Sequence, residues 1–283
     1  MFTTLISADE LKARLQACIV IDCRFDLSAP EAGRAAYLQA HIPGALYAHL
    51  DTDLSGPKTA DAGRHPLPDP AQLATTFGRF GITASSQVIA YDADNGMFAA
   101  RLWWLLRWLG HRAVAVLDGG IKAWTQASHP IDHDPATTAV TTFVGRTFIG
   151  NPQAHMLAEA VAVAACASLS DRRVLDARAP ERFRGDIEPI DPVAGHIPGA
   201  RNHPFAWNLD HDARWLPASE LARKLRTSLD GVAAEHAIVM CGSGVAACHN
   251  LLALEVADLP GAKLYAGSWS EWIRDPTRPV TKG

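Results

Sequence analysis

The sequence predicts an α/β protein of two similar domains, each with a mainly parallel β-sheet flanked by helices. Three observations support this fold class. The chain has 283 residues, which is long for one compact domain. Several short motifs occur twice in the same order. In both halves short apolar segments alternate with amphipathic ones, a rhythm typical of parallel sheets covered by helices on both faces.

The clearest repeated motif is His-Ile-Pro-Gly-Ala, at residues 41–45 and again at 196–200. Pro and Gly predict a turn in both copies. Three further segments have counterparts in the same order: 21–24 with 175–178, 88–92 with 238–241, and 119–124 with 267–272. Such a series indicates a duplication. We therefore expect domains at 1–135 and 153–283, joined by a linker at 136–152 that lacks helical periodicity.

Local patterns predict the elements of each half. Ser7 and Glu10 form a capping-box pattern that opens a helix through about Gln16. Apolar segments predict strands at 18–22, 88–91, 113–117, 174–176, 237–240 and 263–265. Amphipathic or Ala-rich segments predict helices at 98–109, 219–229 and 246–257.

Composition excludes several classes of function. The net charge is -4 and no run of Lys and Arg occurs, which argues against a nucleic-acid partner. The longest apolar stretch, 161–169, is far shorter than the roughly 20 residues of a membrane span. The first 15 residues carry four charges where a signal peptide needs an apolar segment. We therefore expect a cytoplasmic protein that neither crosses nor binds a membrane.

The five cysteines include no Cys-x-x-Cys pair, so the sequence indicates neither a disulfide framework nor a zinc site. They are expected to be free thiols. Their reactivity then depends on local surroundings, because only the thiolate is a nucleophile.

One of them, Cys241, follows a buried strand and precedes Gly242-Ser243-Gly244 and an Ala-rich helix. This order places the thiol at the carboxyl end of a parallel strand, where ligands bind in open α/β sheets. It also directs backbone N–H groups of the loop and the helix N-terminus at the sulfur, which favours a thiolate and a second, anionic sulfur.

The ordinary explanation for such a cysteine is a small buried apolar side chain. The Gly-x-Gly that follows suits the close approach of backbone to an anion better than it suits a core. In the first half Asp92 takes the position of Cys241, so only the second copy keeps a nucleophile.

The duplicated halves, the paired His-Ile-Pro-Gly-Ala turns and the sequence Cys-Gly-Ser-Gly-Val at 241–245 resemble the tandem rhodanese family, which includes thiosulfate and 3-mercaptopyruvate sulfurtransferases. The resemblance covers nearly the whole chain. It implies two rhodanese-like domains, of which the first is noncatalytic with Asp92 in place of cysteine. It also implies that a small anionic donor gives sulfur to Cys241, and that the persulfide passes it to cyanide, a thiol or a thioredoxin-like acceptor. No metal or organic cofactor is implied.

Within the family, Cys-Gly-Ser-Gly-Val is typical of mercaptopyruvate enzymes, whereas thiosulfate enzymes tend to carry charged residues in this loop. By this resemblance Ser243, His65 and Asp53 form a proton-transfer set, and Arg182 holds the donor's carboxylate, for which a guanidinium is a planar match. The loop residues expected to bind substrate are Gly242, Gly244, Val245 and Ala246.

One departure weakens the choice of donor, so thiosulfate stays open as the alternative. Mercaptopyruvate enzymes often have a second arginine in a Glu-Pro-Arg stretch, but Ile190 follows Glu188-Pro189 here. We expect a carboxylate site with a single arginine, Arg182, unless Arg178 or Arg184 supplies the second guanidinium.

Each assigned residue also has an ordinary structural explanation. Ser243 suits a helix cap, His65 a surface loop, Asp53 a turn and Arg182 a solvated ion pair. Cys248 is expected in the core face of its helix rather than as a redox partner of Cys241. Two groups of tryptophans remain: Trp103, Trp104 and Trp108 are expected in a core or domain interface, and Trp269 and Trp272 at the rim of the pocket.

Two other functions are considered. Cysteine phosphatases of the same fold need an arginine that closes a longer loop, but Ala247 and Cys248 occupy the corresponding positions. A noncatalytic binding module would not need Cys241 and its glycine loop. Both functions are therefore less favoured than sulfur transfer.

Overall fold

The computed structural model describes residues 1–133, 147–166 and 169–283. These form two compact units. The N-terminal unit comprises Met1–Gly56, Pro68–Gln153 and His211–Trp215, and the C-terminal unit comprises Pro57–Leu67, Ala154–Asp210 and Leu216–Gly283. The C-terminal unit thus includes a segment, 57–67, from the first half of the sequence. Most of the predicted linker at 136–152 lies outside the described residues, and the predicted domain boundaries stay a prediction.

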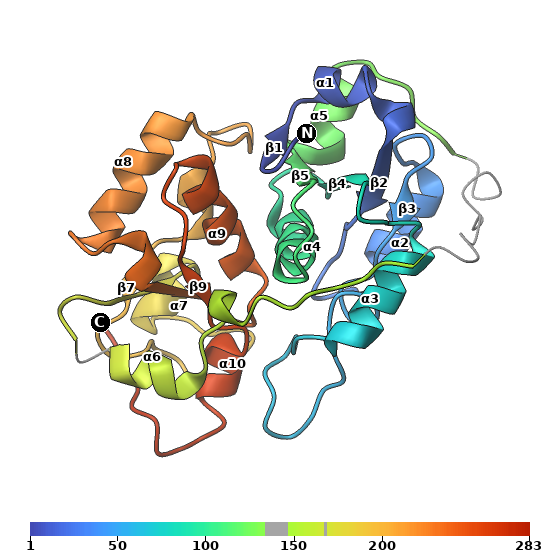
Figure 1. The fold of residues 1–283 in the computed structure, drawn as a ribbon. Coiled ribbons are helices and arrows are strands. Elements are labelled where there is room, and N and C mark those ends of the chain that lie inside the picture. Colours follow the sequence, from blue (N-terminus) through green and yellow to red (C-terminus); the bar gives the residue numbers. More distant parts are fainter. Residues whose placement is uncertain (134–146, 167–168) are drawn as a thin grey trace. The chain divides into compact units, whose positions relative to one another are not determined.

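The N-terminal unit alternates strands and helices (Figure 1). Its strands are β1 (Leu5–Ile6), β2 (Cys18–Asp22), β3 (Leu46–Tyr47), β4 (Gln87–Tyr91) and β5 (Val114–Leu117). Its helices are α1 (Ala8–Lys12), α2 (Ala32–Gln39), α3 (Pro70–Arg79), α4 (Met97–Trp108) and α5 (Gly120–Gln126), with a short 3₁₀ turn at Leu15–Ala17.

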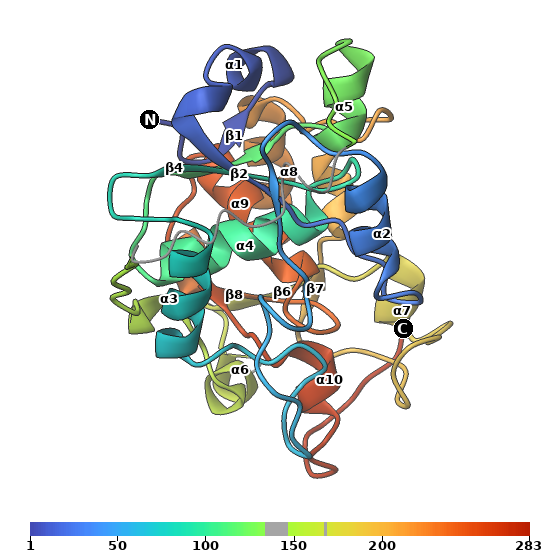
Figure 2. The same cartoon turned by 90° about the vertical axis from the view of Figure 1, so that its right-hand side faces the viewer.

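All strand pairs of this unit are parallel, in the order β1-β5-β4-β2-β3. Asp22 pairs with Tyr91, so the central strands β2 and β4 end at the same edge of the sheet. Helices α1 and α5 lie on one face and α4 on the other (Figure 2). Because both faces are covered, every residue of β5 is buried.

The C-terminal unit repeats this organisation. Its strands are β6 (Arg173–Asp176), β7 (Arg201–Asn202), β8 (Ala237–Met240) and β9 (Lys263–Leu264). Its helices are α6 (Ala160–Cys166), α7 (Pro180–Arg184), α8 (Ala218–Leu229), α9 (Ala246–Val256) and α10 (Ser268–Trp272). Three 3₁₀ turns complete it, at Ala154–Met156, Phe205–Asn208 and Ala234–His236.

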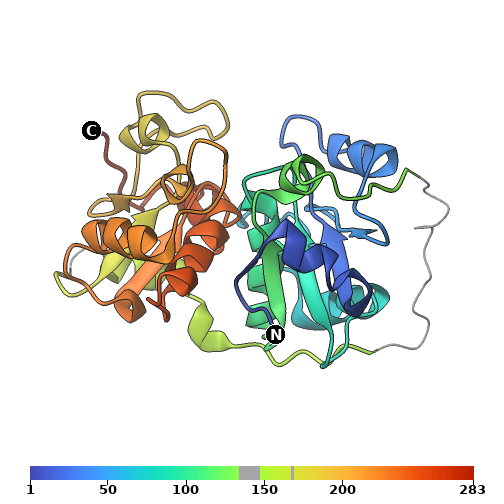
Figure 3. The ribbon, with the colours of Figure 1, turned by 90° about the horizontal axis from the view of Figure 1, so that it is seen from above.

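The second sheet is also parallel, in the order β7-β6-β8-β9, and Figure 3 shows the strands of each sheet side by side. Helices α8 and α9 cover one face, and α6 and α10 cover the other (Figure 1). Strand β8 is buried along its whole length between β6 and β9. A residue directly after β8 therefore stands at the middle of the carboxyl edge of the sheet. The two parallel, helix-flanked sheets confirm the predicted fold class.

Most predicted elements occur within one or two residues of their expected bounds. The capping box is present, because Ser7 Oγ accepts a hydrogen bond from Glu10 N (3.3 Å) while the Glu10 carboxylate accepts one from Ser7 N (3.0 Å). However, α1 ends at Lys12 rather than Gln16. The chain must enter β2 at Cys18, and a tighter 3₁₀ turn replaces the last predicted helical turn.

The two His-Ile-Pro-Gly-Ala segments are turns with glycine at positive φ, 75° at Gly44 and 79° at Gly199. Each histidine stabilises its turn through Nδ1, which lies 2.6 Å from the Tyr37 carbonyl oxygen at His41 and 2.8 Å from that of Phe183 at His196. The repeat is therefore structural. Its turns let each sheet continue to its edge strand, β3 or β7.

Two tryptophan predictions have different outcomes. Trp103, Trp104 and Trp108 are buried on α4, as expected. Trp269 and Trp272 are fully buried in the core between α10 and the second sheet, so their predicted place at a pocket rim is wrong. Packing of these rings against the sheet stabilises α10, because a helix of five residues is marginal by itself.

Candidate active site

Cys241 lies directly after β8, and its backbone is held by the start of α10. Its N–H donates to Ser268 Oγ (3.1 Å), and its carbonyl oxygen accepts from Trp269 N (3.0 Å). Ser268 Oγ in turn donates to the Tyr265 carbonyl oxygen (2.9 Å). Both polar groups of the cysteine backbone are thus satisfied, which fixes the origin of the side chain.

The loop after Cys241 contains two glycines, Gly242 and Gly244, with different surroundings. Gly244 has a φ of 78°, and a Cβ there would lie 2.3 Å from the Ala266 carbonyl oxygen. No side chain fits that space. The Gly244 N–H donates to the Cys241 sulfur (3.2 Å). At Gly242 a Cβ would lie 3.1 Å from Arg64 Nη2, a tight contact, so glycine lets the guanidinium come this close without a shift.

The other amides of the loop are suited to an anion. Within the part of the chain that the structure describes, the N–H groups of Ser243, Val245 and Ala246 donate no hydrogen bond. Helix α9 begins at Ala246, and the first N–H groups of a helix attract negative charge. The loop therefore combines one amide on the sulfur with further donors for a second anionic atom.

The Cys241 thiol has little solvent exposure. Cys241 is only 3% exposed, and Cys248 on α9 is completely buried with its Sγ 3.2 Å from the Gly244 carbonyl oxygen. Cys248 thus occupies the core face of its helix, as predicted. A donor has to be small, or the surroundings have to open, for a sulfur atom to reach Cys241.

Ser243 and His65 are in contact, as predicted. His65 Nδ1 lies 2.7 Å from Ser243 Oγ, and both residues are buried. His65 reaches the loop because the segment 57–67 is part of the C-terminal unit. The pair thus places a hydroxyl, on the residue after Gly242, next to an imidazole, and the two groups together are suited to proton transfer.

Asp53, the third predicted member of this set, belongs to the N-terminal unit. There its carboxylate accepts a hydrogen bond from His49 N (2.9 Å) and one from Arg79 Nη2 (3.2 Å). These contacts hold the turn around Asp53 and do not involve His65 or Ser243.

Arg182, the predicted donor-binding residue, lies beside the loop. Its Nη1 and Nη2 are 3.6 and 3.7 Å from the position that a Cβ on Gly242 would take. Glu188 holds it through three hydrogen bonds to Nε and Nη2, the shortest 2.7 Å. Burial opposes ionisation of Glu188, yet Arg182 and nearby backbone N–H groups keep the pKa of this carboxyl below its usual value.

Arg178 and Arg184, the two candidates for a second carboxylate-binding arginine, form ion pairs with other residues. Arg178 is buried, forms a bidentate pair with Asp176 (shortest distance 2.7 Å) and stacks on Trp269 with 4.6 Å between its Cζ and the ring centroid. Burial tends to lower the pKa of Arg178, but the carboxylate of Asp176 raises it overall. Arg184 is 48% exposed in its side chain and pairs with Asp186 (2.8 Å).

Two residues of this site, Arg64 and Ser268, were not predicted from the sequence. Arg64 lies next to Gly242, although only its neighbour His65 was singled out. Ser268 carries the hydroxyl that binds the Cys241 amide. A signal for Ser268 was present, because it replaces Gly120 when the motif at 119–124 is compared with 267–272. Arg64 had no such signal, since nothing local distinguishes it from a surface cation.

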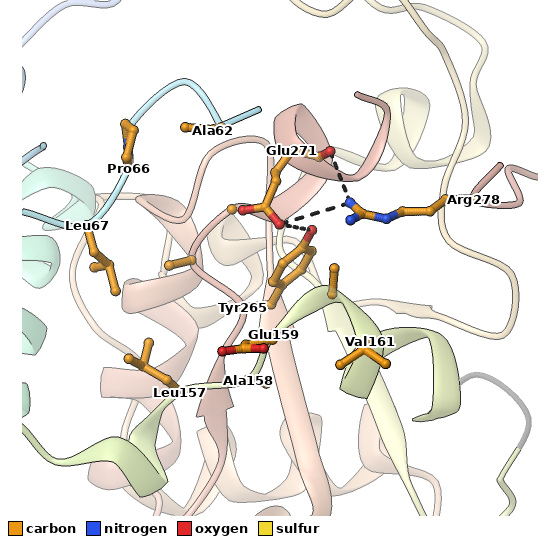
Figure 4. A pocket seen from close by; sticks show the side chains of 14 residues that line it. Ala62, Pro66, Leu67, Leu157, Ala158, Glu159, Val161, Tyr265, Glu271 and Arg278 are labelled. Carbon is orange, nitrogen blue, oxygen red and sulfur yellow. Dashed lines mark hydrogen bonds and ion pairs between the residues drawn. The ribbon is translucent and has the colours of Figure 1, made fainter. Parts of the chain in front are cut away.

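A separate cavity of about 540 Å³ lies beside the segment 57–67 (Figure 4). Its lining includes Ala62, Pro66 and Leu67, and does not include Cys241. At one side the Tyr265 hydroxyl donates to the Glu271 carboxylate (3.0 Å), as Figure 4 shows. Burial and this neighbouring carboxylate raise the pKa of Tyr265.

The described residues were also searched for membrane-spanning helices and for metal-binding groups. Among them, no helix has the length and apolar character needed to cross a membrane. Nor do three or more His, Cys, Asp or Glu side chains of the described segments gather into a group able to hold a metal ion.

Comparison with known proteins relates this geometry to a family. The model of the rhodanese-like domain matches residues 7–127 and 162–275, one match in each half. A protein of Pseudomonas aeruginosa named "Probable 3-mercaptopyruvate sulfurtransferase" is 47% identical over 99% of this chain and 98% of its own length. A Mycobacterium tuberculosis protein named "Putative thiosulfate sulfurtransferase SseB" is 40% identical over 99% of this chain and 97% of its own.

Solved structures agree with these relatives. The 3-mercaptopyruvate sulfurtransferase from Leishmania major superposes with a TM-score of 0.82 at 27% identity, covering 95% of this chain and 74% of that chain. The thiol at the strand end, its glycine loop and the two family matches thus lead to one conclusion. The chain belongs to the rhodanese-like domain family, with two tandem domains, and is an enzyme of the sulfurtransferase kind.

Proposed function

We propose that this sulfurtransferase takes sulfur from 3-mercaptopyruvate, carries it as a persulfide on Cys241 and gives it to cyanide or a thiol acceptor. The observation that carries the choice of donor is the Arg182 guanidinium beside Gly242, one residue from the nucleophile. A guanidinium matches the planar carboxylate of this donor. The Pseudomonas aeruginosa relative, named for the same donor, adds support.

In the first half-reaction the Cys241 thiolate attacks the donor's sulfur. A sulfur–sulfur bond forms and the donor's carbon–sulfur bond breaks, so the carbon leaves with the electron pair as the enolate of pyruvate. One proton converts the enolate to pyruvate. The cysteine sulfur is oxidised to the persulfide level, and the donor carbon is reduced by the same two electrons.

Ser243 and His65 are the residues we assign to proton transfer in this step. Their contact of 2.7 Å forms a short path from a hydroxyl beside the loop to an imidazole. The donor's thiol proton or the proton held by this pair neutralises the leaving carbon. By family resemblance we also propose Asp53 as a member of this proton-transfer set.

In the second half-reaction the acceptor attacks the outer sulfur of the persulfide. Cyanide becomes thiocyanate and a thiol becomes a persulfide, while the electron pair of the sulfur–sulfur bond returns to Cys241 as thiolate. The loop amides of Gly242, Gly244, Val245 and Ala246 are suited to hold the outer sulfur while it carries negative charge. We propose a thioredoxin-like protein or a small thiol as the acceptor in the cell.

Thiosulfate is the second candidate donor, favoured by the name of the Mycobacterium tuberculosis relative. Sulfite, the leaving group from thiosulfate, needs no proton, whereas the enolate that leaves 3-mercaptopyruvate must be protonated on carbon. Proton transfer by a Ser-His pair is therefore less useful with thiosulfate. Residues 242–246 also carry no cation for a doubly charged donor.

The test is a side-by-side measurement of kcat/KM for the two donors with cyanide as acceptor. We expect 3-mercaptopyruvate to exceed thiosulfate. A higher kcat/KM for thiosulfate would refute the assigned donor and leave the persulfide on Cys241 intact.

We assign catalysis to the domain at 153–283 and a noncatalytic role to the domain at 1–135, because Asp92 replaces the nucleophile there. We place the enzyme in the cytoplasm, where thiols stay reduced, since all five cysteines are free. Fractionation of cells that produce the protein, followed by detection with an antibody, tests this location.

A further inference from the structure

We propose that Arg64 is a specificity-determining residue that binds the donor's carboxylate together with Arg182. The inference rests on the proposed function and deepens it. It assigns a second carboxylate-binding arginine to a chain in which Ile190 stands where an arginine was expected. The carboxylate site then has two guanidinium groups, and the second comes from a distant part of the sequence.

Asp191 holds the two guanidinium groups next to each other. Its Oδ1 accepts a hydrogen bond from Arg64 Nη1 (2.6 Å), and its Oδ2 accepts one from Arg182 Nη2 (3.2 Å). The Asp191 side chain is only 4% exposed. One buried carboxylate thus bridges both cations and offsets their mutual repulsion.

Both guanidinium groups meet at Gly242. Measured from the position of a Cβ on this glycine, Arg64 Nη2 is 3.1 Å away and Arg182 Nη1 is 3.6 Å away. Gly242 directly follows the nucleophile, and Ser243 directly follows Gly242. A donor with its sulfur at Cys241 therefore has two cations within reach of its other end.

The two arginines also have N–H groups to spare. Arg64 Nε is buried without an acceptor among the described residues, and in the same described segments neither Arg64 Nη2 nor Arg182 Nη1 forms a hydrogen bond. A buried donor without an acceptor is costly. A carboxylate brings two acceptor oxygens in the plane that a guanidinium matches.

The position of Arg64 is fixed by the same helix that fixes Cys241. Arg64 N donates to Ser270 Oγ on α10 (2.9 Å). At Gly63 a Cβ would lie 2.5 Å from the Gly267 carbonyl oxygen, so the segment 57–67 packs on α10 with backbone in contact. Ser268 of α10 binds the Cys241 amide. Helix α10 thus sets the spacing between nucleophile and cation.

A purely structural role for Arg64 would be to anchor the loop that carries His65 through Asp191. The two roles differ in one respect. An anchor affects all reagents that reach Cys241, whereas a carboxylate-binding residue affects only those that carry a carboxylate.

Iodoacetate and iodoacetamide test this difference, because they alkylate a thiol alike and differ in a carboxylate against an amide. The measurement is the alkylation rate of Cys241, followed by peptide mass spectrometry in the full-length protein. In Arg64→Gln we expect the ratio of the iodoacetate rate to the iodoacetamide rate to fall about 10-fold or more. The iodoacetamide rate should stay within about twofold. Arg64→Lys, which keeps the charge, should retain part of the preference.

Kinetics with the proposed donor supply the second readout. Arg64→Gln should raise KM for 3-mercaptopyruvate about 10- to 100-fold with a smaller change in kcat, as expected from the loss of a charge-assisted hydrogen bond. The matched control is Arg184→Gln, which removes an exposed arginine paired with Asp186. It should leave both the rate ratio and KM unchanged.

Equal slowing of both reagents, or an unchanged ratio and KM, would overturn the inference. Its failure is distinguishable from failure of the proposed function. If the unmodified enzyme prefers thiosulfate, the assigned donor is wrong while the alkylation ratio still reports on Arg64. If it prefers 3-mercaptopyruvate and the variant keeps its ratio and KM, only the role of Arg64 is wrong.

Discussion

The loops after β4 and β8 share a backbone framework. The Asp92 carbonyl oxygen accepts from Ile121 N (2.9 Å), just as the Cys241 carbonyl oxygen accepts from Trp269 N (3.0 Å). In both units the loop leads into a long helix, α4 or α9. The comparison shows that duplication preserved the support of the loop, so the difference in chemistry resides in side chains.

The N-terminal loop is filled by its own anion. The Asp92 carboxylate accepts three hydrogen bonds, from Gly96 N and Phe98 N (both 2.9 Å) and from Ala99 N (3.2 Å). Burial raises the pKa of Asp92, although these N–H groups favour its ionised form. The sulfur of Cys241 accepts one such bond, from Gly244 N. The C-terminal loop therefore keeps amide N–H groups for the substrate anion that we propose.

A second difference lies where the supporting helix begins. Gly120 and Ser268 have nearly the same positive φ, 56° and 54°. At Gly120 a Cβ would lie 2.5 Å from the Asp92 carbonyl oxygen, so no side chain fits. Ser268 adopts this unfavourable conformation with a side chain, and its hydroxyl binds the Cys241 amide. The copy to which we assign catalysis thus carries backbone strain, and the Ser268 hydroxyl holds its proposed nucleophile in place.

The largest expected effect tests which copy carries the chemistry. Cys241→Ser should abolish the uptake of one sulfur atom, measured by intact mass after incubation with 3-mercaptopyruvate, and lower turnover by ~10³-fold or more. Serine lacks a sulfur able to form a persulfide. Cys248→Ser is the control, since Cys248 faces the core, and it should still gain sulfur. Sulfur uptake by the Cys241→Ser protein would break the comparison.

The next effect concerns stability. Asp92→Ala leaves three buried N–H groups without their acceptor and should lower the free energy of unfolding by about 3 kcal/mol. Cys241→Ala removes one weak acceptor and a small volume, so we expect a loss of about 1 kcal/mol. Urea unfolding of both variants measures the difference. Asp171→Asn, at an exposed carboxylate, serves as the control. Equal losses in the first two variants would contradict the idea that Asp92 fills its loop.

Ser268 offers a smaller test. Ser268→Gly restores the residue found in the N-terminal copy and relieves strain, so its net effect on the free energy of unfolding should be within about 1 kcal/mol. Ser268→Ala keeps the strain and loses the acceptor of the Cys241 amide, which should cost about 1–2 kcal/mol. Both variants should slow sulfur uptake by Cys241. If alanine were tolerated better than glycine, the strain argument would be wrong.

The smallest expected effect is the contribution of one histidine of the C-terminal unit, His203, to the pH dependence of stability. Burial lowers the pKa of His203, although its hydrogen bond to Asn208 opposes this. Ala48 takes the corresponding place in the first unit. The folded state then binds fewer protons than the unfolded state, so the stabilisation is complete above about pH 6.5 and is lost as pH falls below it. The slope is at most about 1.4 kcal/mol per pH unit for this group.

Urea midpoints between pH 7 and pH 5.5 measure this slope. His203→Gln should reduce it but not remove it, because burial also lowers the pKa of His196 and His111. A variant with the full slope would show that His203 does not contribute.

Regular features of the fold were predictable from local patterns. Strands β2, β4, β5 and β8 are mainly apolar runs, and buried parallel strands produce such runs. The two-residue edge strands β1, β3 and β7 were missed, since so short a segment has no periodicity and is defined only by its partner. The place of Trp269 was also misjudged, because burial against a sheet depends on how α10 docks.

By itself the sequence determined the duplication, and it predicted the nucleophile at the end of β8 and, through family resemblance, the pairing of Ser243 with His65. The duplication and the position of Cys241 depend on local order along the chain. The pairing of Ser243 with His65 was predicted only by resemblance, because the two residues are 178 positions apart. Only the tertiary structure decided that Arg64 stands beside Arg182, that Asp191 bridges them and that Ser268 binds the Cys241 amide. The reason is physical: Arg64 and Arg182 come from distant segments, and their spacing is set by packing on α10 and by one shared carboxylate, which no local pattern encodes.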